Sequence, residues 1–148
     1  MSLSRLIYAS HIDPAHWSED SFERIIRGAR AFNQVNGVTG LLLFKRQRFL
    51  QLLEGSRECV ADVMSRVHAD PRHRELSIIS VEDIDERLCA TWSMAIVPEG
   101  RITRPLLGRF FATADFEPHS LSADGAVRFC SEIEALVERE ELRAVSNG

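Results

Sequence analysis

Residues 40–55 of this chain read G-L-L-L-F-K-R-Q-R-F-L-Q-L-L-E-G. Two apolar runs, 38–44 and 48–53, flank a charged segment at 45–47, a pattern that predicts two strands joined as a hairpin. Gln51 lies inside the second run. Burying an unpaired amide costs about 1–3 kcal/mol, so a neighbouring side chain, a bound water or a flat polar ligand has to satisfy it.

The segments around the hairpin predict two helices. Ser18 is the expected cap of a helix over 18–35, which Asn36-Gly37 ends. The apolar stripe of that helix continues onto Asn33, and its members are Phe22, Ile25, Ile26 and Ala29. Glu54-Gly55 is expected to turn the chain. Ser56 then caps a second helix that ends near Asp70-Pro71, with a stripe of Val60, Val63, Met64 and Val67.

Further strands are expected at residues 3–10, 76–81 and 91–97. The resulting order, βαββαββ, predicts an α+β ferredoxin-like sandwich with two helices on a five-stranded mixed sheet. We expect a domain over 1–98 and a helical extension over 99–148, with helices at 105–112 and 123–142. The last helix carries an apolar stripe that could cover the other sheet face: Ala126, Phe129, Cys130, Ile133, Leu136 and Val137.

Composition excludes several classes of function. The 148 residues carry a net charge of −4 and no basic block, so nucleic acid is not an expected partner. No apolar run approaches the roughly 20 residues that span a bilayer, and no signal-peptide pattern occurs. The three cysteines are widely spaced, which predicts reduced thiols in the cytoplasm. The sequence lacks HExxH, GxSxG, P-loop and GxGxxG patterns, so neither a metal site nor an enzyme is expected.

Tyr8 and Gln51 form the first candidate site. In a split βαβ arrangement the third strand lies beside the first, which makes these residues possible lateral neighbours. A structural hydrogen bond between them is the simpler explanation. With Asn33 in the same crevice, however, two amides and a phenol suit a planar heterocycle with alternating N–H and C=O groups, such as a flavin ring.

A second candidate cluster lies at the end of the second helix: Arg66, Asp70, Arg72 and His73. It reads either as a solvated helix terminus or as a mouth that holds phosphates. Trp92 and Met94 alternate onto one face of the fifth strand, where they either fill the core or lie beside a flavin.

Several blocks together resemble the BLUF domains, the flavin-based blue-light sensors. They are L-I-Y-A-S at 6–10, F-N-Q-V-N-G-V-T-G-L-L-L-F at 32–44, F-L-Q-L-L-E-G at 49–55, D-P-R-H at 70–73 and W-S-M at 92–94. Length and tail resemble the short, stand-alone members of that family.

The resemblance implies noncovalent FAD, with its ring between the two helices over the sheet. Tyr8, Asn33, Gln51, Trp92 and Met94 match the ring-site positions. Asp70, Arg72 and His73 match the block near the ribityl and phosphate end, and Arg66 lies close by. We also assign Ile25 and Val67, on the two helix stripes, to the cofactor site. Ala29 and Phe32 depart from relatives that carry polar groups there.

The resemblance also implies a mechanism. Light is expected to drive proton-coupled electron transfer from Tyr8 through Gln51, after which the Gln51 amide rotates or tautomerises. The signal then passes to a partner protein, and the chain is expected to self-associate. The alternatives are a non-photochemical ferredoxin-like module that binds a ligand or dimerises, and a small hydrolase or flavin oxidoreductase.

Overall fold

The computed structural model describes residues 2–90, 94–97 and 99–147, with side chains described as far as residue 139. Its strands are β1 (Leu3–Ile12), β2 (Thr39–Lys45), β3 (Arg48–Ser56), β4 (His73–Ile84) and β5 (Ala95–Val97). Its longer helices are α1 (Ser21–Asn36), α2 (Arg57–Ala69), α3 (Arg104–Phe110) and α4 (Ala123–Asn147), and short 3₁₀ turns include η3 (Pro118–Ser120).

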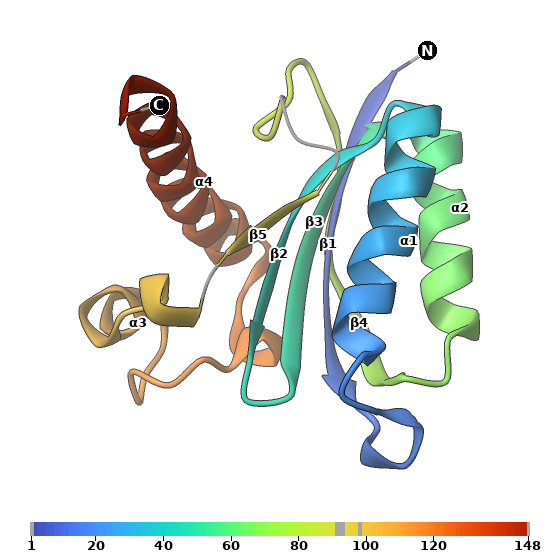
Figure 1. Ribbon diagram of the computed structural model, residues 1–148, viewed down its shortest axis with the longest axis horizontal. Helices are drawn as coiled ribbons and strands as arrows, with labels where there is room; N and C mark the ends of the chain where they lie inside the picture. Colours follow the sequence, from blue (N-terminus) through green and yellow to red (C-terminus); the bar gives the residue numbers. More distant parts are fainter. Residues whose placement is uncertain (1, 91–93, 98, 148) are drawn as a thin grey trace.

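The strands form one five-stranded sheet in the order β4-β1-β3-β2-β5. Neighbours pair antiparallel, except that β5 runs parallel to β2, so the sheet is mixed as predicted. Helices α1 and α2 lie side by side on one face, and α4 crosses the other side of the sheet (Figure 1). The α+β ferredoxin-like fold with C-terminal helices is thereby confirmed.

Local signals placed most boundaries correctly. The β2–β3 hairpin turns through Arg46 and Gln47, both left-handed at φ 51° and 65°, as a two-residue turn between twisted strands requires. Gly37 ends α1 with φ 66°. The Ser56 hydroxyl caps α2 by accepting from the Cys59 amide at 3.2 Å.

One strand boundary, one turn and one cap were predicted wrongly. The strand β4 extends three residues beyond the predicted 76–81 at each end. Glu54-Gly55 does not turn the chain: both residues pair with β1, which keeps β3 extended to Ser56, and Glu54 also pairs with Thr39 of β2. Ser18 does not cap α1, which begins at Ser21. The Ser18 amide instead donates to the Ser21 hydroxyl at 2.8 Å, which forms a turn ahead of the helix.

Alternation along the strands builds two cores. On one face, side chains such as Leu53 and Phe49 pack against α1 and α2. On the other face, Leu50 and Leu52 pack against the C-terminal helices, where Phe129 and Ile133 are fully buried. The tail helices therefore cover the second face of the sheet, as the apolar stripe of the last helix predicted.

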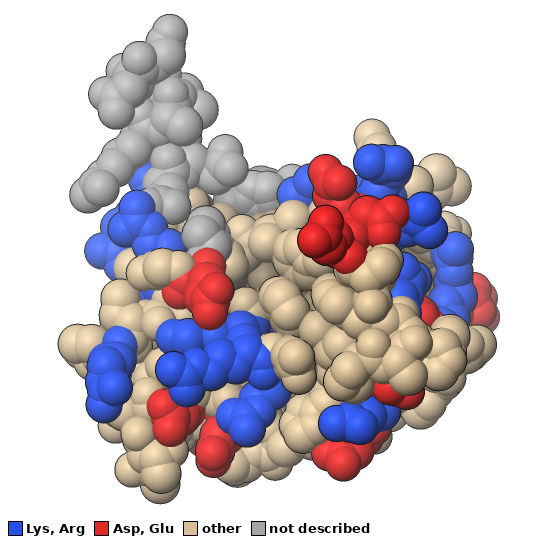
Figure 2. Space-filling view, turned by 60° about the horizontal axis from the view of Figure 1, so that its bottom comes forward, with Lys and Arg blue, Asp and Glu red and all other residues tan. Residues whose placement is uncertain are grey.

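The surface drawn in Figure 2 carries acidic and basic side chains interspersed, with no broad field of one sign. Among the described residues, no helix is both long and apolar enough to cross a bilayer.

Candidate functional site

A cavity of about 540 Å³ lies between α1 and α2 above the centre of the sheet. Such a volume is typical of sites for small molecules and cofactors. The residues that line it are Tyr8, Arg24, Ile25, Gly28, Ala29, Phe32, Asn33, Gln51, Val63, Arg66, Val67, Ala69, Asp70, Pro71, Arg72 and His73.

The space exists because α1 presents small residues toward α2. Gly28 and Ala29 carry no side chain larger than a methyl group, and a Cβ added at Gly28 would meet no atom within 4 Å. Across the gap, Val63 and Val67 are short. The walls are therefore apolar, and the polar groups lie at the floor and at one end.

Tyr8 and Gln51 form the floor. They are direct partners in the β1–β3 register, as predicted, and both are buried. The Tyr8 hydroxyl donates to Gln51 Oε1, and Gln51 Nε2 donates to Met94 Sδ at 3.4 Å. Burial, reinforced by the nearby charge of Asp70, raises the pKa of Tyr8 well above its ordinary value, so the phenol is protonated at neutral pH.

Asn33 faces the cavity from the last turn of α1, with only 1% of the residue exposed. Its backbone carbonyl accepts from the amides of Gly37 and Val38, which fixes this end of the helix. The amide side chain therefore stands on a rigid backbone near the Gln51 amide, as expected from the apolar stripe.

Charged residues gather at the mouth, beyond the C-terminus of α2. The Arg72 guanidinium forms hydrogen bonds to both Asp70 oxygens at 2.8–3.1 Å. Burial pushes the pKa of Asp70 upward, but the hydrogen bonds and charge of Arg72 outweigh it and hold that pKa below its ordinary value. Arg66 lies over the Phe32 ring, with its guanidinium carbon 4.5 Å from the ring centre. Two held cations are suited to phosphate groups.

His73 lies between the floor and the mouth. Its Nδ1 is 2.8 Å from the Ser10 hydroxyl, and its ring meets that of Tyr8 edge to face. Burial lowers the pKa of His73 and outweighs the opposing charge of Asp70, so the imidazole is neutral at neutral pH.

The cavity brings together all the predicted cofactor residues except Met94, which lies just beyond it and contacts Gln51. Trp92 lies outside the described residues. Sequence reasoning missed Arg24, Gly28, Ala69 and Pro71, and it assigned Val63 only to the core. Gly28 was detectable, because it follows Ile25 by three positions on the same helix face.

The family model described as sensors of blue-light using FAD matches residues 3–95. The chain belongs to the BLUF family. The BLUF match covers β1 to β4, the first residue of β5 and both helices that frame the cavity. It confirms that this is a blue-light sensor domain that uses FAD.

The sequence relatives of this BLUF chain are much longer proteins, and the matched regions are small parts of them. The blue light- and temperature-regulated antirepressor BluF of Escherichia coli (strain K12) is 39% identical over 74 residues, 48% of this chain and 17% of the relative. The photoactivated adenylate cyclase subunit beta of Euglena gracilis is 30% identical over 76 residues, 51% of this chain and 9% of the relative. The chain therefore spans less than a fifth of either relative.

Solved BLUF structures match nearly the whole chain. BlsA in its photo-activated state is 29% identical with a TM-score of 0.78, covering 89% of this chain and 94% of that one. The dark state of BlrB is 30% identical with a TM-score of 0.70, covering 91% and 96%. Because these coverages exceed the residues of the BLUF match, the likeness extends into the tail helices.

The residues of the cavity fit FAD. An apolar slot with two amides and a phenol suits a planar ring with a polar edge, and the cations at the mouth suit the pyrophosphate. Gly28 leaves space where a side chain would otherwise intrude.

Proposed function

We propose that Tyr8 and Gln51 carry the photochemistry of this blue-light sensor. The observation behind the proposal is the buried hydrogen-bond chain from the Tyr8 hydroxyl through the Gln51 amide to Met94 Sδ. A planar amide that accepts at one end and donates at the other can relay a change in the phenol to the next group.

We assign the holding of FAD to the residues that line the cavity. The Asn33 and Gln51 amides would bind the polar edge of the ring, Ile25 and Val67 would contact its faces, and His73 would lie near the ribityl chain. The two guanidinium groups, Arg66 and Arg72, would bind the phosphates, and Asp70 would hold Arg72 in place. Arg72→Met should therefore weaken binding of FAD, measured by fluorescence titration, but leave binding of riboflavin, which lacks phosphates, nearly unchanged. Equal losses for the two would contradict this assignment.

The bound flavin, excited by blue light, supplies a one-electron oxidant. Tyr8 is the electron donor in this proposal. Because burial keeps the phenol protonated, the hydroxyl proton leaves only together with the electron, and Gln51 Oε1 stands ready to accept it. Rotation or tautomerisation of the Gln51 amide then changes the group that faces Met94 Sδ.

The output passes from Met94 to the tail in this proposal. Met94 directly precedes β5, whose Ala95 and Val97 belong to the core shared with the C-terminal helices. A change at Gln51 would therefore alter a strand that α3 and α4 cover, and a partner protein would respond to those helices. This mechanism needs a two-state element, and we propose that β5 and its neighbours form it.

Three further assignments belong to the same proposal. The division between 1–98 and 99–148 separates sensor from output, and the chain acts as a sensor with no catalytic activity of its own. Self-association is proposed through the edge strand β4, which exposes Ile78 and Val81 at 48% and 62%. The three cysteines are free, which suits the reducing cytoplasm we propose.

Absorption spectroscopy tests the function. Protein reconstituted with FAD should show a flavin spectrum that shifts reversibly to the red under blue light and recovers in darkness. A protein that takes up no flavin would favour the ligand-binding or dimerisation alternative. A bound flavin that bleaches with NAD(P)H and shows no red shift would favour an oxidoreductase.

A further inference from the structure

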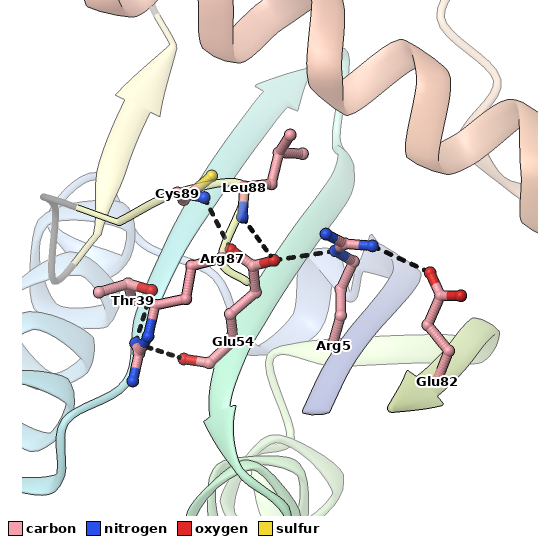
Figure 3. Close-up of polar contacts among 7 residues, drawn as sticks. All are labelled: Arg5, Thr39, Glu54, Glu82, Arg87, Leu88 and Cys89. Atoms are coloured by element: carbon pink, nitrogen blue, oxygen red, sulfur yellow. Dashed lines mark hydrogen bonds and ion pairs between the residues drawn. The ribbon is translucent and has the colours of Figure 1, made fainter. Parts of the chain in front are cut away.

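Glu54 carries a carboxylate buried on the sheet face opposite the cavity. The side chain is 0% exposed and lies between β3 and the segment that follows β4 (Figure 3). Its Oε2 accepts from Arg5 Nε and from the Leu88 amide, both at 2.9 Å, and its Oε1 accepts from the Cys89 amide at 2.7 Å.

This carboxylate is costly to bury, and three donors among the described residues form hydrogen bonds to it. Arg5 neutralises its charge and bridges onward to Glu82 at 2.9 Å. Two consecutive backbone amides supply the remaining bonds, so the charge fixes the main chain at Leu88 and Cys89. The photochemical proposal above makes no use of this group.

Arg87 fastens the same segment a second time. Its guanidinium donates to the Thr39 hydroxyl at 2.9 Å and to the Glu54 carbonyl at 3.2 Å (Figure 3). It also donates to the Gly37 carbonyl at 2.9 Å. Residues 87–89 are thus tied to the adjoining ends of β2 and β3 and to the residue that ends α1.

Met94 lies five positions after Cys89, and two hydrogen bonds hold it on the cavity side of the sheet. Gln51 Nε2 donates to its sulfur at 3.4 Å, and Arg30 Nε donates to its carbonyl at 3.2 Å. Five residues reach at most about 18 Å, so an anchor at Cys89 limits where Met94 can lie. Gln51 and Glu54 are three positions apart on β3, and their side chains therefore point to opposite faces.

We propose that Glu54 is a positioning residue for the photocycle. By fixing the amides of Leu88 and Cys89, it limits where Met94 can lie relative to the Gln51 amide. Cys89 is also buried in the core that contains Phe129 and Cys130 of α4, so the same anchor joins the Met94 segment to the tail. The proposal rests on the photochemical role of Gln51, but its structural half can be tested in the dark.

The test compares Glu54→Gln with Glu82→Gln. The first change keeps the size of the side chain but replaces one acceptor oxygen with an NH₂ group. That group then faces either a backbone amide or the Arg5 guanidinium, and it cannot accept a hydrogen bond from either. The second removes only the negative charge of the outer partner of Arg5, whose oxygen can still accept from the guanidinium, and leaves the backbone anchor intact. This makes it the matched control.

Three readouts apply to FAD-loaded protein. Met94 is one of three methionines, so its ¹³C-methyl signal is readily assigned. In Glu54→Gln we expect this signal to move or split in the dark, and exchange of the Leu88 and Cys89 amides to accelerate at least tenfold. We also expect recovery from the red-shifted state to slow at least fivefold, because the anchor favours the dark arrangement. Glu82→Gln should stay within twofold of the wild type in both rates.

The proposal is overturned if Glu54→Gln speeds amide exchange but leaves the Met94 signal unchanged and does not slow recovery more than twofold relative to the wild type. Glu54 would then be structural only. If this variant does not fold, Glu54→Asp decides, since the carboxylate still neutralises Arg5 but is one methylene shorter and draws back from the Leu88 and Cys89 amides. Faster exchange of these amides with an unchanged Met94 signal there overturns the proposal equally. Failure of the photochemical proposal looks different, because the wild type itself would then show no red shift while the dark Met94 signal still reports on the anchor.

Discussion

Replacement of Gln51 by leucine tests whether the buried amide links Tyr8 to the light response. Leucine has a similar volume but cannot form hydrogen bonds, so the Tyr8 hydroxyl, in a residue only 2% exposed, loses its acceptor. Leaving one buried hydroxyl unpaired costs about 1–3 kcal/mol. Tyr8→Phe should cost a similar amount, because Gln51 Oε1 then loses its donor.

The double variant separates the pair from its surroundings. When both partners become apolar groups of similar shape, neither group is left unpaired, so the double change should cost less than the sum of the single changes by about 1 kcal/mol. Urea unfolding in the dark at a fixed excess of FAD measures this coupling. Each single variant should also bind FAD and lose the reversible red shift.

Gln34→Leu provides the matched control, since the same substitution falls on an exposed position of α1. It should change the free energy of unfolding by less than about 0.5 kcal/mol and keep the red shift. Costs for Gln51→Leu and Tyr8→Phe that add within about 0.3–0.5 kcal/mol would refute the coupling. A normal red shift in Gln51→Leu would refute the relay.

The remaining predictions concern the cofactor, pH and the tail. Asn33→Ala should weaken FAD binding about five- to tenfold in a fluorescence titration, because about 1 kcal/mol of hydrogen bonding to the ring is lost. The protein that still binds FAD should keep the red shift, and an unchanged affinity would contradict the role of Asn33. Burial lowers the pKa of His73, so the unfolded chain binds the proton more readily than the folded chain. The contribution of His73 to the free energy of unfolding should therefore be fully present above about pH 7 and fall as the pH drops towards the lowered pKa. Urea midpoints at pH 7.5 and 5.5 should differ less in His73→Asn than in the wild type or in His68→Asn, and equal differences in all three would exclude His73 as a source. Truncation after Gly100 should leave FAD binding possible but uncover the sheet face formed by Leu50 and Leu52. Solubility should then fall, or the oligomer size measured by light scattering should change. An unaltered size and stability would show that the tail is dispensable.

Much of the fold was predictable because its signals are local. The Ser56 cap involves an amide three residues away, and Gly37 ends α1 through its own backbone conformation. The pairing of Tyr8 with Gln51 followed from the topology alone, since the third strand of a split βαβ unit lies beside the first. Five residues of the cavity followed from helix stripes that face the sheet: Ile25, Ala29, Asn33, Val63 and Val67.

The error at Glu54-Gly55 occurred where partners distant in the sequence outweighed a local signal. The pair resembles a turn, yet both residues pair with β1, and Glu54 also pairs with β2, which holds them extended. The fifth strand was expected over 91–97, and the described part of it is Ala95–Val97, with Met94 just before it.

The sequence by itself determined the order of the elements, the hairpin and the polar residues of the cavity other than Arg24, because periodicity and caps depend on neighbours a few positions away. Only the tertiary structure decided what surrounds them. The bond from Arg30 to Met94 joins residues 64 positions apart, and those from Leu88 and Cys89 to Glu54 span 34 and 35. Contacts of this kind depend on the packing of the whole sheet, and no pattern within one segment encodes them.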